Sequence, residues 1–232
     1  MNRTSKSAKN VAASLMAQLA VIFLGFFTRA VFVKQLGVEL VGVNAVLMSI
    51  VALLTFLDLG ISWALMYALY KPLADNDAEK IVGIVEYAGR LFRWVSLAVC
   101  ILGLAVLPFI DRFVKVDSRV PHLEQYYLVL LANTVFGYLM AHRIVLLNAD
   151  QKVHVVQVFS LTFNVLRSIA QIVSLYFFAS FFLFLCILVF FTLVNNVVIT
   201  VFVGAPVSRV TQQANKTGSR RTPLSSWLPS AL

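Results

Sequence analysis

The sequence predicts an all-α polytopic membrane protein with six transmembrane helices. Apolar residues make up 60% of the 232 positions and charged residues 12%, whereas an average soluble domain carries about 25% charged residues. The apolar residues occur in segments of about twenty, each long enough to cross a ~30 Å hydrocarbon layer, and short charged loops divide them. One large soluble core would not require apolar segments of this length separated by charged loops. We therefore expect the protein to lie in a lipid bilayer.

The first helix follows a basic N-terminus, which a cleaved signal peptide would also show. Its apolar run exceeds the usual hydrophobic region of such a peptide, and Arg29 occupies the place where a cleavage site should lie. We therefore expect it to remain as a membrane span. The six predicted spans are residues 11–33, 42–66, 92–110, 124–147, 154–177 and 181–203, which together form a membrane lobe over 1–203.

Two stretches differ from the spans. The segment from Lys71 to Tyr87 mixes charged residues with Ile and Val, which predicts a short cytoplasmic amphipathic helix at the membrane interface. From Gly204 onward the hydrophobicity falls, and proline, serine, threonine and arginine accumulate. This composition predicts a disordered cytoplasmic tail over 204–232.

Basic residues are distributed unequally between the two sides of the predicted bundle. The positive-inside rule places the richer side, with both termini, in the cytoplasm. The net charge of +9 is thus explained by basic residues on the cytoplasmic side of a membrane protein, and no nucleic-acid partner is expected. The poorer side carries Lys34, Arg112, Lys115 and Arg119. The richer side carries Arg3, Lys6, Lys9, Lys71, Lys80, Arg90, Arg93, Arg143, Lys152, Arg209, Lys216, Arg220 and Arg221.

Signatures of enzymes, metal sites and cofactors are absent from the sequence. It contains no Gly-rich phosphate loop, no Ser/His/Asp arrangement and no HExxH pair, so an enzyme is not expected. The three histidines lack metal-ligand spacing, and no metal or other cofactor is expected. Cys100 and Cys186 lie inside apolar spans, where we expect reduced packing residues.

Polar residues inside the spans are the candidate functional residues. A charged side chain at a helix centre costs ~2.5–3.5 kcal/mol on insertion scales, so such residues usually face a protein interior or a wet cavity. Spacings of three and four place the polar residues of each helix on one face, and together these faces predict a central hydrophilic cavity. The fifth helix carries Gln157, Ser160, Asn164, Arg167, Gln171 and Ser174. The other stripes are Asn44, Thr55, Asp58 and Ser62 in the second helix, Ser14, Gln18, Gly25 and Arg29 in the first, and Thr192, Asn195, Asn196 and Thr200 in the sixth.

Structural roles compete with the cavity interpretation. Hydroxyl and amide side chains often form hydrogen bonds between membrane helices, each worth about 1 kcal/mol. Arg167 has the alternative of an internal salt bridge, with Asp58 as the candidate partner. Arg29 lies near the outer end of its helix, from which its guanidinium could reach the interface.

Several short motifs occur around the first, second and fourth spans. They are Arg29 and Leu36-Gly37 at the end of the first helix, Gly42 and Asn44 at the start of the second, Asp58-Leu59-Gly60, Leu69-Tyr70-Lys71-Pro72-Leu73, and Asn148-Ala149-Asp150-Gln151-Lys152. In combination they closely resemble Wzx-type lipid-linked oligosaccharide flippases of the multidrug/oligosaccharidyl-lipid/polysaccharide (MOP) superfamily. The resemblance covers about residues 8–203.

The resemblance implies a two-lobed transporter of the bacterial inner (cytoplasmic) membrane. Such a protein moves an undecaprenyl-diphosphate-linked oligosaccharide repeat unit between leaflets for surface polysaccharide synthesis, alongside a glycan polymerase and chain-length machinery. Arg29 matches a family position and is the first candidate for contact with diphosphate or sugar. Arg167, Asn164, Gln171 and Asn44 are further cavity candidates, and Asp58 is a candidate for gating or ion coupling.

The sequence departs from the family after the sixth span, where a second lobe would follow. We expect a truncated chain with an out-of-frame tail that transports nothing alone, and the alternative is a natural six-helix protein acting as a homodimer. Two other functions stay open. Another small-molecule exporter of the superfamily should favour acidic cavity residues, and a membrane glycosyltransferase or polymerase should use outer-loop carboxylates such as Asp111, Asp117 and Glu124.

Overall fold

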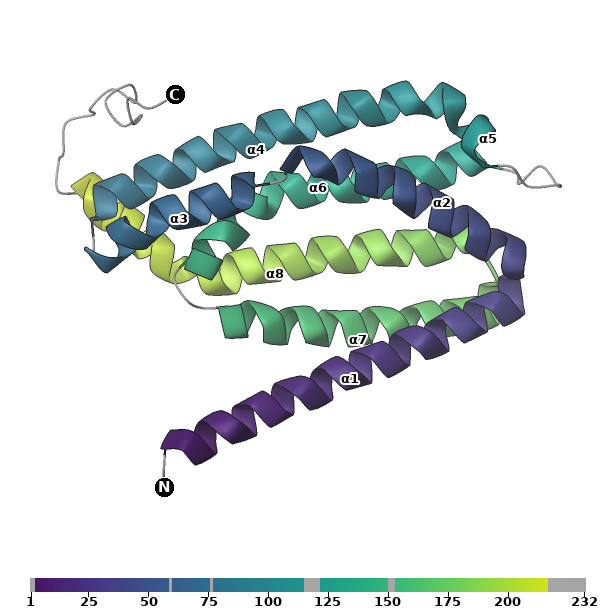
Figure 1. Ribbon diagram of the computed structural model, residues 1–232, viewed down its shortest axis with the longest axis horizontal. Coiled ribbons are helices and arrows are strands. Elements are labelled where there is room, and N and C mark those ends of the chain that lie inside the picture. Colours follow the sequence, from purple (N-terminus) through teal and green to yellow (C-terminus); the bar gives the residue numbers. More distant parts are fainter. Residues whose placement is uncertain (1–2, 59, 76, 115–121, 150–152, 217–232) are drawn as a thin grey trace.

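The computed structural model describes residues 3–58, 60–75, 77–114, 122–149 and 153–216. These residues are almost entirely helical and form a bundle of antiparallel helices (Figure 1). The elements are α1 (Arg3–Leu36), α2 (Val38–Thr55), the 3₁₀ turn η1 (Phe56–Asp58), α3 (Ile61–Ala74), α4 (Ala78–Val106), the 3₁₀ turn η2 (Leu107–Phe109), α5 (Ile110–Phe113), α6 (Leu123–Ala149), α7 (Val153–Phe178) and α8 (Phe181–Lys216).

Six stretches of the described residues are helical, long and apolar enough to cross a membrane. Between 17% and 28% of the residues in each are buried inside the bundle. Because most of these apolar residues face outward, the bundle suits lipid rather than water as its surroundings. The predicted fold class, an all-α polytopic bundle, is confirmed. The stretches are Gln18–Leu36, Val38–Thr55, Glu79–Phe113, Leu123–Leu146, Val156–Phe178 and Phe181–Val201.

The helices alternate in direction, which gives the bundle two distinct ends. The "α7–α8 end" contains the α1–α2, α5–α6 and α7–α8 connections (Figure 1). The opposite "α3–α4 end" contains the start of α1, the end of α8, and the α3–α4 and α6–α7 connections (Figure 1). Every helix that crosses the bundle therefore begins at one end and finishes at the other.

Two connections at the α7–α8 end are very short. Gly37 alone separates α1 from α2, with φ at 87°, and its N–H donates to the Val33 carbonyl at 3.0 Å. A residue without Cβ adopts this left-handed conformation without strain, which explains glycine at the turn. Ala179 and Ser180 separate α7 from α8, and Ala179 also has a positive φ of 42°.

The helices pack in a defined order. α7 lies between α1 and α8, and α8 in turn lies between α7 and α6. α6 contacts α4 on its other flank, while α2 and α3 pack across α4 and α6. In Figure 1 the first part of α1 diverges from its neighbours.

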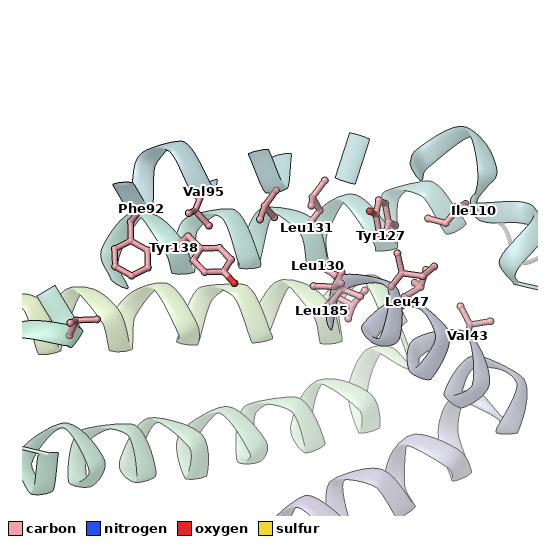
Figure 2. Close-up of a cluster of buried hydrophobic side chains, with 14 of the residues drawn as sticks. Val43, Leu47, Phe92, Val95, Ile110, Tyr127, Leu130, Leu131, Tyr138 and Leu185 are labelled. Atoms are coloured by element: carbon pink, nitrogen blue, oxygen red, sulfur yellow. The ribbon is translucent and has the colours of Figure 1, made fainter. Parts of the chain in front are cut away.

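The core lies where α2, α4, α6 and α8 meet. Figure 2 shows Leu47, Phe92, Tyr127, Leu130 and Leu185 directed into this region, and each is at most 2% exposed. In lipid such burial gains little from the hydrophobic effect, because the outside is equally apolar. Close packing and interhelical hydrogen bonds stabilise the bundle instead. Tyr127 Oη donates to the Gly103 carbonyl at 3.0 Å, which links α6 to α4.

The predicted second span, residues 42–66, is interrupted. α2 ends at Thr55, η1 covers Phe56–Asp58, and α3 begins at Ile61 after Gly60, whose φ is 91°. A left-handed residue cannot continue a right-handed helix, so the chain changes direction within the bundle. α2 and α3 together make the second crossing.

The prediction of a separate interfacial helix over Lys71–Tyr87 is wrong. Residues 71–74 finish α3, and residues 78–87 form the first part of α4. The Asp77 side chain caps α4 by accepting the Lys80 backbone N–H at 3.2 Å. From Ile81 through Ala88 to Phe92, one buried stripe continues along α4 without a break. Tertiary packing thus joins the charged segment to the membrane helix.

The predicted disordered tail begins too early. α8 continues through Lys216, so residues 204–216 are helical rather than disordered. Residues 207–216 contain neither glycine nor proline, which permits this extension. The remaining part of the predicted tail, residues 217–232, lies outside the described residues.

Candidate functional site

Arg167 of α7 is a cation within the interior of the bundle. It lies at the middle of the span Val156–Phe178, and its Nε atom is buried without a hydrogen-bond partner. Among the described residues, an ion pair joins Asp77 to Lys80 at 2.6 Å, and Asp58 is not bonded to Arg167. The alternative of an Arg167–Asp58 salt bridge is therefore not seen among the described residues.

Gln171, one turn further along α7, has a structural role. It is 4% exposed, and its Nε2 donates to the Phe184 carbonyl of α8 at 3.2 Å. Ser174 Oγ donates in turn to the Gln171 carbonyl at 2.9 Å. The first bond joins α7 to α8 and uses one N–H of the Gln171 side-chain amide, whereas the second lies within α7 and uses the Gln171 backbone carbonyl.

α8, which packs against α7, also carries buried polar side chains. Asn195 Oδ1 and Thr200 Oγ1 are buried without partners, and Asn196 is 8% exposed. α7 and α8 pack side by side along most of their length (Figure 1). We call Asn164, Arg167, Asn195, Asn196 and Thr200 the α7–α8 polar seam.

Asn44 and Asp58 lie apart along α2 and η1. Asn44 Oδ1 is buried without a partner near the start of α2. The Asp58 carboxylate accepts from Ser62 Oγ at 3.1 and 3.2 Å, just before α3. A carboxylate at a helix N-terminus is favoured by the helix dipole, so Asp58 stabilises the start of α3. Its predicted gating or ion-coupling role stays a prediction.

Arg29 lies on the exposed surface of α1. Its neighbour Thr28 is buried and donates to the Leu24 carbonyl at 2.8 Å, whereas Phe26 and Phe27 are exposed like Arg29. No described residue bonds to the Arg29 guanidinium. The structure thus gives Arg29 an outward position on α1 and Arg167 an interior one on α7.

Polar groups of α6 were missed by the sequence interpretation. Asn133 Oδ1 and His142 Nδ1 are buried without partners, and Tyr138 Oη donates to the Thr55 carbonyl at 3.3 Å. The last bond satisfies a carbonyl at the interruption between α2 and α3. Asn133 precedes Tyr138 by five positions, and a Tyr and a His four positions apart do not form a long polar stripe, so none drew attention to α6.

The buried polar atoms without partners define what the interior can do. In an apolar medium each such atom raises the free energy of the folded state unless water or a ligand satisfies it. Amide and hydroxyl oxygens accept hydrogen bonds, and the guanidinium donates them to an anion. The described residues contain no group of three His, Cys, Asp or Glu that could hold a metal ion. Cys100 and Cys186 are free thiols.

Comparison with known proteins gives no relative for this chain. No family model, no curated protein and no solved structure matches it. The resemblance to Wzx-type flippases therefore rests on the short motifs of the sequence.

Proposed function

We propose that this multi-pass membrane protein binds an undecaprenyl-diphosphate-linked oligosaccharide, as a lobe of a Wzx-type flippase in the bacterial inner membrane. The observation that carries the proposal is the half-buried Arg167 side chain, whose buried Nε has no partner at the middle of α7. A cation in this position requires a compensating anion or water. The diphosphate supplies two negatively charged groups that accept hydrogen bonds from arginine.

The rest of the polar seam suits the sugar part of the same ligand. Asn195 Oδ1 and Thr200 Oγ1 are buried without partners on the neighbouring helix. Sugars carry many hydroxyl groups, which can donate to such oxygens and accept from amide nitrogens. A cation beside neutral amides and hydroxyls matches a ligand with an anionic end and a hydrophilic body.

The proposal includes an orientation in which the α3–α4 end faces the cytoplasm. Lys71, Arg90, Arg93 and Arg143 belong to this end, whereas Lys34 and Arg112 belong to the opposite one. The positive-inside rule assigns the more basic end to the cytoplasm. Both termini of the bundle then lie on the cytoplasmic side.

Binding of the lipid-linked sugar by the purified chain tests the proposal. The parent and Arg167→Met are placed in nanodiscs and titrated with undecaprenyl-diphosphate-linked oligosaccharide, and retained ligand is counted by native mass spectrometry. Charge-assisted hydrogen bonds contribute about 1.5–3 kcal/mol, so the variant should bind tenfold or more weakly. Gln157→Ala, on the exposed part of the same helix, is the matched control.

Two results would contradict the proposal. One is equal binding by the parent and by Arg167→Met. The other is equal binding of undecaprenol without its diphosphate, because recognition would then not involve the anion.

A further inference from the structure

A second cationic cluster lies between α4 and α6, away from the polar seam. Gly89 of α4 faces the His142 ring of α6 so closely that a Cβ at Gly89 would lie 3.7 Å from His142 Cδ2. Arg93 follows Gly89 by one helical turn, and Arg143 adjoins His142 in the chain. The charges of both arginines act on the His142 ring. Two cations from neighbouring helices thus flank one point of the contact between α4 and α6.

Both guanidinium groups are available to a ligand. Arg93 and Arg143 are exposed, and neither forms an ion pair with a described residue. Arg93 Nε donates to the Gly89 carbonyl at 3.1 Å, which holds the side chain against α4 and leaves its two terminal amino groups without a described partner. Glu86 lies on the same face of α4 two turns before Arg93, and it pairs with neither arginine.

The position along α4 corresponds to the edge of the hydrocarbon layer. α4 alone has 29 residues, or about 43 Å at 1.5 Å per residue, which exceeds the ~30 Å of the layer. On α6, Arg143 lies about 30 Å beyond Leu123, where the apolar stretch Leu123–Leu146 begins at the α7–α8 end, so this level lies about one layer thickness from that end. Trp94, next to Arg93 in the chain, is 70% exposed, and exposed tryptophan is typical of the headgroup level.

An apolar stripe continues from the arginines toward the membrane centre. Leu97, Ile101 and Leu104 are exposed at spacings of four and three, so they share one face of α4. This face offers a path for an acyl chain directly beyond the cationic cluster. A small soluble anion would contact only the cationic cluster, whereas a lipid would contact both the cluster and the apolar stripe.

We propose that Arg93 and Arg143, with His142 between them, bind the phosphodiester headgroup of an anionic phospholipid whose acyl chain lies along Leu97, Ile101 and Leu104. Arginine donates two parallel hydrogen bonds to phosphate oxygens, and juxtamembrane cations attract anionic lipids. The site needs the membrane location of the bundle and is independent of the flippase proposal. A protein with any transport activity, or none, would bind lipid here.

Lipid binding by the full chain tests this site. The parent, Arg93→Gln/Arg143→Gln and the control Lys34→Gln/Arg112→Gln are purified in detergent and titrated with phosphatidylglycerol, and bound lipid is counted by native mass spectrometry. The control removes two exposed cations from the opposite end of the bundle. We expect the α4–α6 variant to bind about 25-fold more weakly, from about fivefold for each cation, and the control to match the parent.

The parent also provides measurements that do not depend on the folding of a variant. Its affinity for phosphatidylglycerol should fall as sodium chloride is raised from 50 to 500 mM, because salt screens exposed charges. Phosphatidylcholine should bind more weakly at every salt concentration. Equal phosphatidylglycerol binding by the variant and control, a salt-independent affinity, or displacement by an equal concentration of glycerol phosphate would each overturn the lipid site.

Discussion

At the scale of single residues, the contacts separate polar side chains that hold helices together from those that have no hydrogen-bond partner among the described residues. Gln171 and Arg167 lie one turn apart on α7. The amide of Gln171 already has the Phe184 carbonyl as its acceptor, whereas Arg167 Nε has none. Spacing alone grouped both residues in one stripe, but only the contacts assign them different roles.

Replacing Arg167 by methionine should raise the stability of the empty protein. A buried donor without a partner costs about 1–3 kcal/mol, and methionine fills much of the same space without that cost. The free energy of unfolding in detergent should therefore increase by this amount. Thermal or denaturant unfolding measures it, with the exposed Arg29→Met as control. A decrease in stability would mean that Arg167 has a structural partner.

Replacing Gln171 by leucine should instead lower the stability of the protein. The change removes the interhelical hydrogen bond to Phe184, and such bonds average about 0.6 kcal/mol in membrane proteins, with a maximum of about 1.7. The same unfolding assay should register a loss within this range. Gln157→Leu, on the exposed part of α7, should change the stability less. Equal losses of stability in the two variants would contradict a stabilising role of the Gln171 hydrogen bond.

At the scale of elements, the lengths of the apolar runs predicted the helices better than the polar residues predicted their interruptions. The six spans followed from hydrophobicity because each crossing must satisfy its own backbone within the lipid. The interruption at Asp58 was missed because apolar residues continue on both sides of it. The start of α4 was missed because charges near Asp77 resemble the edge of a membrane span, although one buried stripe joins Ile81 to Phe92.

The candidate site was predictable only in part for a similar reason. Helical periodicity places Asn164, Arg167 and Gln171 on one face, but it does not say which neighbouring helix that face meets. Asn133 and His142 do not belong to one long polar stripe on α6, so only the packing of α6 against other helices reveals their burial.

The start of α4 should loosen in acid through Asp77. Its carboxylate lies beside Lys80, and the hydrogen bonds from Lys80, first of all that from its side chain, hold the Asp77 pKa below the usual value of 3.8. A lowered folded-state pKa means that the cap stabilises α4 above pH 3.8 and loses this effect as the pH falls through the lower, folded-state value. Hydrogen exchange of residues 78–81 should therefore accelerate in acid.

Two variants distinguish the capping hydrogen bond of Asp77 from the charge of its carboxylate. Asp77→Asn should keep part of the cap and lose the acid-dependent change, since asparagine also accepts the N–H bond but does not titrate. Asp77→Ala should accelerate exchange at neutral pH. An unchanged pH profile in Asp77→Asn would show that another group controls the start of α4.

At the scale of the whole molecule, the two ends of the bundle should lie in different compartments. With Cys100 and Cys186 replaced by serine, single cysteines at Lys71 and Arg143 mark the α3–α4 end, and one at Lys34 marks the α7–α8 end; all three positions are exposed. A membrane-impermeant maleimide should label Lys34→Cys in spheroplasts and the other two only after permeabilisation. The reverse pattern would invert the proposed orientation.

The turn at Gly37 and the pair Ala179–Ser180 have a further consequence for the α7–α8 end. A protease must draw an extended segment of chain into its cleft, and exposed loop tips are the usual sites of cleavage. One residue between α1 and α2, and two between α7 and α8, offer no such segment. Proteases added on that side of the membrane should therefore leave the α1–α2 and α7–α8 hairpins intact as membrane-protected fragments.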